Sequence, residues 1–176
     1  REHDTEFVAI SSLAGHQIDR YKIHANEKQL IYANNLVSGN SQERIKGDSY
    51  YAIEFFVSNG TSRFPEMDKD NITHFMVNYN KYTRFNKMKI YNKNYDSVRE
   101  IIVNNFKTLP FCQRFIQKNT NIQSKEINEI LDYFFEQGIL TKYPAVLDLD
   151  SDVRVSQFEH TIFVPNDSSK NAEVLS

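Results

Sequence analysis

The spacing of apolar residues changes partway along this chain, and this change most narrows the folds open to it. Up to about residue 93, short runs of β-branched and aromatic residues alternate with polar connections, which is typical of strands. From about residue 94, apolar residues recur three and four positions apart, which is typical of helices with one buried face. The pattern therefore predicts an α+β protein in which a β-rich module precedes a helical one.

The first module is expected to span residues 1–93 and to form a sheet, a barrel or a sandwich. Its most informative strand is YYAIEFFV, in which Tyr51, Ile53 and Phe55 share one face while Ala52 and Glu54 share the other. Because both faces are largely apolar, this strand is expected at the centre of a sheet that is covered on both sides. The predicted strands are 7–10, 18–24, 29–33, 50–57, 74–79 and 87–92.

Three helices are expected after residue 94. Asp96 or Ser97 is placed to cap the first, because either side chain accepts the free amide protons of a first turn. Pro110 tolerates the first turn of a second helix. Ser124 opens a third, and Gly138 supplies the left-handed residue that ends it.

Strand-like residues 139–143 and 153–164 follow the third helix. Helix, helix, helix and hairpin is the element order of a winged helix, which residues 95–164 resemble. The resemblance implies a C-terminal three-helix, winged-helix-like module over residues 94–165, with the hairpin as its wing. Residues 166–176 are polar and are expected to form a mobile tail.

The third predicted helix is acidic, with one lysine against four acidic residues over residues 124–136. A helix that enters the major groove of DNA needs cations facing the phosphates. This helix and the wing are therefore expected to contact a protein partner instead. The candidate residues are Glu129, Asp132, Tyr133, Phe135 and Glu136.

The opposite charge gathers just upstream, where residues 78–99 hold six basic residues, one acidic residue and five aromatic residues. Cations on phosphates beside rings stacked on bases favour single-stranded nucleic acid, or another acidic partner. The same pattern also fits an edge strand whose lysines discourage pairing with other chains. The candidate binding residues are Lys81, Arg84, Phe85, Lys87, Lys89, Tyr91 and Lys93.

The sequence carries few catalytic or metal-binding patterns. Phosphate-binding glycine loops, nucleophile elbows and zinc-finger spacings do not occur in it. A site of two histidines and one carboxylate was considered, but His16 and Asp19 lie three apart, which does not match alternation along one strand. The histidines weighed with them are His24, His74 and His160. No metal site and no cofactor is predicted.

One cysteine, Cys112, cannot form an internal disulfide bond, so an intracellular protein is expected, cytoplasmic or nuclear. It falls among apolar residues of the second helix and is expected to be buried and inert. The sequence contains no apolar run of membrane-spanning length, so no membrane contact is expected.

Taken together, these patterns favour a non-catalytic binding subunit or adaptor of an intracellular complex. Its acidic helix is expected to meet a protein, and its basic aromatic strand to meet nucleic acid or an acidic partner. One alternative is a module that captures an extended peptide by adding it to a strand edge. Another is an enzyme, or a fragment of one, with its site in the β module, which a deep pocket there holding convergent histidine and carboxylate groups would indicate.

Overall fold

The computed structural model describes residues 7–10, 13–32, 45–60, 66–147 and 152–176. The chain forms two compact units. Unit 1 consists of Arg1–Glu66 with Val146–Ser176, and unit 2 consists of Met67–Ala145. The sequence predicted module boundaries after residues 93 and 165 instead. The observed boundaries differ because the last part of the chain returns to the unit in which the chain begins.

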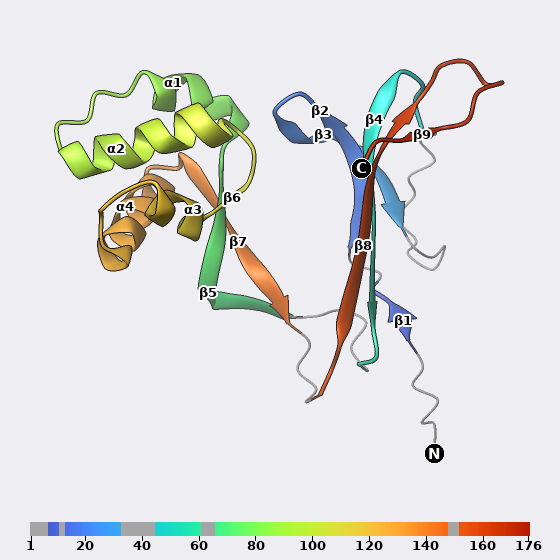
Figure 1. Cartoon of the computed structure of the whole chain (residues 1–176), viewed down its shortest axis with the longest axis horizontal. Helices are drawn as coiled ribbons and strands as arrows, with labels where there is room; N and C mark the ends of the chain where they lie inside the picture. Colours follow the sequence, from blue (N-terminus) through green and yellow to red (C-terminus); the bar gives the residue numbers. More distant parts are fainter. Residues whose placement is uncertain (1–6, 11–12, 33–44, 61–65, 148–151) are drawn as a thin grey trace. The chain divides into compact units, whose positions relative to one another are not determined.

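Unit 1 is built on one antiparallel sheet. Its strand order is β3-β2-β4-β8-β9, and β1 also pairs with β4 (Figure 1). The strands are β1 (Val8–Ala9), β2 (Ala14–Asp19), β3 (Lys22–Tyr32), β4 (Ser49–Ser58), β8 (Val155–Val164) and β9 (Glu173–Val174).

Strand β4 lies in the interior of this sheet, as its two apolar faces predict. It pairs with β2 on one side and with β8 on the other. Tyr51 and Ala52 are both buried, although they point to opposite faces. The hydroxyl of Tyr51 accepts a hydrogen bond of 2.8 Å from the amide of Lys46, which gives the buried ring a polar partner.

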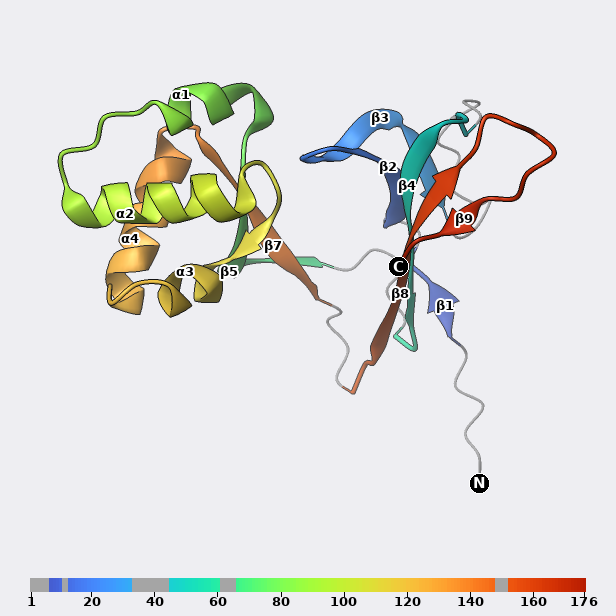
Figure 2. The ribbon, with the colours of Figure 1, turned by 45° about the horizontal axis from the view of Figure 1, so that its top comes forward.

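Unit 2 combines short helices with a small sheet of order β6-β5-β7. Helix α2 lies beside α4 (Figures 1 and 2). The elements in chain order are β5 (Glu66–Val77), η1 (Tyr79–Lys81), α1 (Tyr82–Asn86), α2 (Lys93–Ile101), the π-helical η2 (Ile102–Phe106), β6 (Phe111–Cys112), α3 (Gln113–Lys118), α4 (Ser124–Glu136) and β7 (Leu140–Leu147).

The core of unit 2 forms around the apolar stripe of α4. Phe134 is fully buried and meets the ring of Phe85 edge-on, with 5.0 Å between centroids. Gly138 takes φ +66° after the helix, as predicted, and the amide of Ile139 then bonds to the carbonyl of Phe134. The other buried residues of the α4 stripe are Ile127, Ile130 and Leu131. Cys112 is buried, as predicted.

The predicted winged helix is wrong: the fold is α+β, with two β-sheets and few helices. The two strands expected to form the wing belong to different sheets. Strand β7 pairs beside β5, whereas β8 pairs with β4 along its whole length, from Ser49↔Val164 to Ser58↔Val155. The reason is that alternation marks a segment as a strand but does not identify its partner.

Four local predictions also need correction. Residues 87–91 form a connection and not a strand, since α1 ends just before them. Helix α2 begins earlier than expected, because Asn92 caps it by accepting hydrogen bonds from the amides of Asn94 and Tyr95. Pro110 precedes the short strand β6, so α3 starts only at Gln113. The predicted tail contains β9, which pairs with β8.

Candidate functional site

A cluster of ionisable side chains lies on one face of the unit 1 sheet. His16 of β2 is directly opposite Ala52 of β4, and Glu54 is two residues further along the same face. Glu54 in turn is directly opposite Glu159 of β8. Three neighbouring strands therefore bring one imidazole and two carboxylates to the same face.

His16 is held in place from several directions. Its Nε2 lies 3.4 Å from Oε1 of Glu54, and its Nδ1 lies 3.4 Å from the carbonyl oxygen of Gln17. The ring meets that of His24 edge-on, with 4.3 Å between centroids. The residue is only 6% exposed, so this geometry is maintained by burial as well as by polar contacts.

The backbone of β2 is shaped to place this histidine. A Cβ on Gly15 would lie 2.5 Å from the carbonyl oxygen of Ala52, so only glycine lets β2 approach β4 this closely. The pairing of β2 with β3 also shifts register between His16 and Gln17. Such irregularities re-aim side chains and are frequent beside functional sites.

The electrostatics of the cluster are unusual for a structural sheet. Burial alone lowers the pKa of His16, because it disfavours the charged ring. The hydrogen bonds to Glu54 and to Gln17 outweigh burial, together with the charges of Glu54 and Glu159, so the pKa of His16 is raised. Two carboxylates directly opposite each other repel, so the pair costs stability unless a cation lies near it.

The donor set fits part of a metal site. Imidazole nitrogen and carboxylate oxygens are donors that suit manganese, iron, cobalt and zinc ions. Within the described ranges, however, no group of three or more His, Cys, Asp or Glu side chains could hold a metal ion by itself. His16, Glu54 and Glu159 therefore fit as one side of a metal site that needs further ligands.

Sequence reasoning considered His16 but missed both glutamates. Asp19 is exposed at the end of β2, where its carboxylate accepts a hydrogen bond from the amide of Arg20. His160 points to the opposite face from Glu159, and His74 belongs to unit 2. The available signal was Glu54 itself, a carboxylate inside an otherwise apolar strand.

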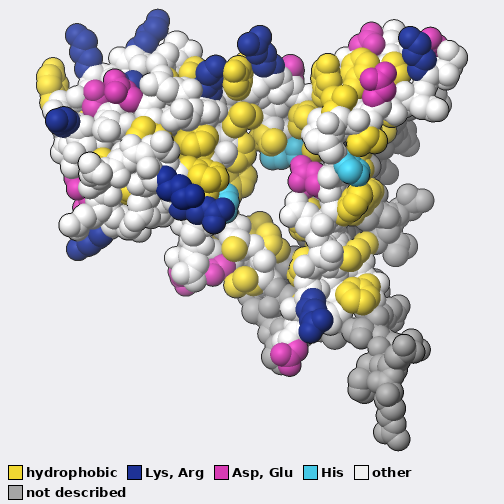
Figure 3. All heavy atoms as spheres, viewed as in Figure 1, with side chains coloured by type: hydrophobic (Ala, Val, Ile, Leu, Met, Phe, Trp, Pro, Cys, Tyr) yellow, Lys and Arg dark blue, Asp and Glu magenta, His cyan; other side chains and the backbone are white. Residues whose placement is uncertain are grey.

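The predicted basic residues lie in unit 2. Lys81 ends η1, Arg84 lies in α1, and Lys93 is the first residue of α2. Lys87, Lys89 and Tyr91 are exposed on the connection between α1 and α2. In Figure 3, dark-blue side chains project along the edge of unit 2 that carries α1 and this connection.

Phe85 does not belong with these surface residues. It is fully buried against Phe134, so its ring is part of the core and cannot stack on a ligand.

The predicted protein-contacting residues are spread around α4. Glu129, Asp132 and Glu136 are exposed, and so is Phe135, with 43% of its surface accessible. Tyr133 is half-buried and meets the rings of its neighbours Tyr95 and Phe134. Only part of the expected surface is therefore available to a partner.

Unit 2 has an open hollow on its surface. It is lined by Asp70, Ile72, Phe75, Asn128, Asp132 and Lys142. Lys142 Nζ lies 2.7 Å from Oδ1 of Asp132 and 4.5 Å from the ring centre of Phe135, so its charge is already satisfied. The hollow offers no pair of acid and base comparable with His16 and Glu54.

In the part of the chain that the structure describes, none of the helices has the length and apolar character needed to cross a membrane.

Comparison with known proteins gives relatives of about 30% identity. The chain matches no family model. It is 32% identical over 166 residues to methionine aminopeptidase 2 of Encephalitozoon intestinalis, which covers 94% of this chain and 42% of the relative. It is 30% identical over 167 residues to methionine aminopeptidase of Saccharolobus solfataricus, which covers 92% of this chain and 49% of the relative. The chain thus spans less than half the length of these two relatives.

A solved structure shares the fold. "Structure of a thermophilic Arx1" matches with a TM-score of 0.66 over 91% of this chain and 39% of that chain, at 14% identity. These comparisons overturn the expectation of a winged-helix adaptor. The fold is shared with the Arx1 structure and is not a winged helix, and the relatives in sequence are named as enzymes.

Proposed function

We propose that unit 1 carries one side of an aminopeptidase active site that removes N-terminal methionine from peptides. The observation that supports this most directly is the convergence of His16, Glu54 and Glu159 on one sheet face. The names of the relatives indicate the reaction, and the cluster offers some of the metal-binding groups that such a hydrolysis uses. The ligand in this proposal is a peptide whose first residue is methionine.

The residues would divide the chemistry between them. The two glutamates and the imidazole of His16 would hold a divalent cation, completed by ligands from additional chain of the kind present in the longer relatives. When bound, such a cation polarises the peptide carbonyl and lowers the pKa of water. Glu54 contacts His16 and so fixes the ring that faces the cation. His24 lies against His16 and is exposed, so it can donate a hydrogen bond to the peptide.

The setting in which we propose that this reaction takes place is the interior of a cell. Cys112 is a free thiol, and free thiols fit a reducing compartment.

The direct test is a chimera. The segment of the Encephalitozoon intestinalis enzyme that aligns with this chain is replaced by it, and methionine release from Met-Ala-Ser is measured with added Mn²⁺ or Co²⁺. We expect release by the chimera and a fall of at least about 100-fold on Glu54→Gln or Glu159→Gln. Asp19→Asn is the matched control, because it removes the same charge from an exposed position outside the cluster.

A chimera that unfolds cooperatively yet releases no methionine would contradict the proposal, as would activity that survives both glutamine substitutions. If the chimera does not fold, a second measurement on this chain alone tests the proposal. The chain alone is titrated with Co²⁺ while its visible absorption is followed. The proposal requires an absorption band that weakens with Glu159→Gln and persists with Asp19→Asn.

A further inference from the structure

We propose that a second site, on unit 2, binds single-stranded nucleic acid. This site is the basic edge, defined as Lys81, Arg84, Lys87, Lys89, Tyr91 and Lys93. It is independent of the proposed peptidase cluster, because every residue in it belongs to unit 2 and none lies on the unit 1 sheet.

The cations of the basic edge keep their charge available. Lys81, Arg84, Lys87, Lys89 and Lys93 are all exposed, and none lies within 4.0 Å of a carboxylate in the described part of the chain. Surface cations on a folded domain are commonly interspersed with anions. Five exposed cations without carboxylate partners, within thirteen residues, give a local field that attracts phosphate.

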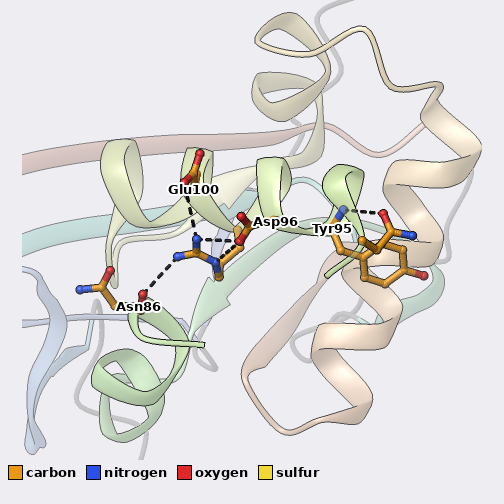
Figure 4. Close-up of polar contacts among 6 residues, drawn as sticks. Asn86, Tyr95, Asp96 and Glu100 are labelled. Carbon is orange, nitrogen blue, oxygen red and sulfur yellow. Dashed lines mark hydrogen bonds and ion pairs between the residues drawn. The ribbon is translucent and has the colours of Figure 1, made fainter. Parts of the chain in front are cut away.

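The nearby carboxylates of α2 are partly offset by Arg99. Nη2 of Arg99 lies 2.7 Å from Asp96 and 3.6 Å from Glu100 (Figure 4). Arg99 also donates from Nη1 to the carbonyl of Asn86, at the end of α1. This side chain therefore offsets one of the two negative charges of α2, and it ties α2 to the start of the basic connection.

The exposed ring of Tyr91 is the reason why we favour a nucleic-acid strand over other anionic partners. It is 98% exposed, so its ring packs against nothing in the described structure. Lys89 and Lys93 flank it at two residues on either side. A ring that stands between cations can stack on a base while the cations contact the phosphates beside it. Acidic side chains of a protein would use the cations, but they offer no flat face on which this ring could stack.

The site needs an unpaired strand. Bases inside a duplex are already stacked, whereas those of a single strand have open faces for Tyr91. Contact with phosphates and one stacked base carries little sequence information. The basic edge is therefore expected to bind single strands of many sequences, with a strong dependence on salt.

The test is binding of a fluorescent 12-nucleotide oligouridine to the whole chain, followed by anisotropy. Five phosphate contacts predict that affinity falls about 100-fold between 50 and 200 mM salt. Lys87→Gln with Lys89→Gln is expected to weaken binding about 25-fold at 100 mM salt. Tyr91→Ala is expected to weaken it at least about 5-fold, and Tyr91→Phe, which keeps the ring, to leave it unchanged.

The matched control is Lys118→Gln with Lys125→Gln, which removes the same charge from exposed positions on α3 and α4. It should retain wild-type affinity, and melting curves should show that all variants fold. Equal loss in the control would overturn the site, and so would binding that is insensitive to salt. Displacement of the oligouridine by polyglutamate at matched charge would assign the surface to an acidic protein instead. Binding of an oligothymidine of the same length is measured in parallel to compare DNA with RNA.

Discussion

The two units of this chain are stabilised in different ways. Unit 2 encloses a closed apolar core, in which Phe85, Phe134 and Ile116 are fully buried. Unit 1 is an extended sheet, and several of its large apolar side chains stay exposed, such as Phe158 at 60% and Val155 at 52%. The first arrangement provides stability, and the second provides a face on which ionisable groups converge.

The difference shows where functional groups can be tolerated. His16, Glu54 and Glu159 lie together on the unit whose described residues bury few large side chains. The closed core of unit 2 admits no such group, and its charges stay on the outer edge. Repulsive or strained groups cost stability, so their presence in unit 1 indicates a role other than folding.

The largest expected effect tests the difference in packing between the two units, by truncating one aromatic ring in each. Phe134→Ala removes a fully buried ring and should lower the free energy of unfolding of unit 2 by about 3–5 kcal/mol. Phe158→Ala removes a ring that is 60% exposed and should cost less than about 1 kcal/mol. Hydrogen exchange resolved by residue measures both. Equal losses would show that the unit 1 sheet is as well packed as the core of unit 2.

The close approach of β2 to β4 gives the next largest effect. Gly15→Ala places a Cβ 2.5 Å from the carbonyl oxygen of Ala52, so the strands must separate, at about 1–3 kcal/mol. Methionine release by the chimera should fall as well, because His16 moves relative to Glu54. Denaturant unfolding and the peptide assay test this together. A variant with wild-type stability would mean that β2 is not held by this contact.

Arg99 tests whether unit 2 orders its basic edge. Arg99→Met keeps the aliphatic length but removes the contacts to Asp96 and Asn86, and is expected to cost about 1–2 kcal/mol. Amide exchange should quicken over residues 87–92 while α4 stays protected. Unchanged exchange there would show that the connection is ordered by its own contacts.

Gly138 gives the smallest expected change. Gly138→Ala meets no neighbouring atom within 4 Å, so the cost comes only from the left-handed backbone at φ +66°, about 1 kcal/mol. A shift of the melting temperature measures it. Comparison with Gly15→Ala separates backbone strain from steric collision, and a larger loss at position 138 would reverse that assignment.

Local features of the fold were predictable from sequence, but its pairings were not. The stripe of α4, its end at Gly138 and the interior position of β4 follow from spacing and residue type. The partner of β8 could not be predicted. Nearly a hundred residues separate β4 from β8, and the alternation of apolar residues does not identify which strand pairs with which. The predicted wing failed for this reason.

The candidate site was hidden by the same limit. Asp19, which is near His16 in the chain, was the carboxylate weighed as its partner. The carboxylates that share the sheet face of His16, Glu54 and Glu159, belong to two other strands. Glu54 stands out in YYAIEFFV as the charged residue of an apolar run, which is the one signal that sequence offered. The fully exposed Tyr91 was identified from its residue type and its basic neighbours, but only the structure removes Phe85 from that group.

The pairing of Ser58 with Val155 joins two strands that lie far apart in sequence. Strands β4 and β8 pair as the two strands of a hairpin do, although they are not adjacent in sequence. Hydrogen bonds between Asn59 and Arg154 extend the pairing by one residue. Everything from residue 60 to residue 153 leaves and returns at the tip of that hairpin. A short turn could replace the whole excursion while Glu54 and Glu159 stayed in register. In chain order, unit 2 is thus an insertion between the two strands that carry Glu54 and Glu159.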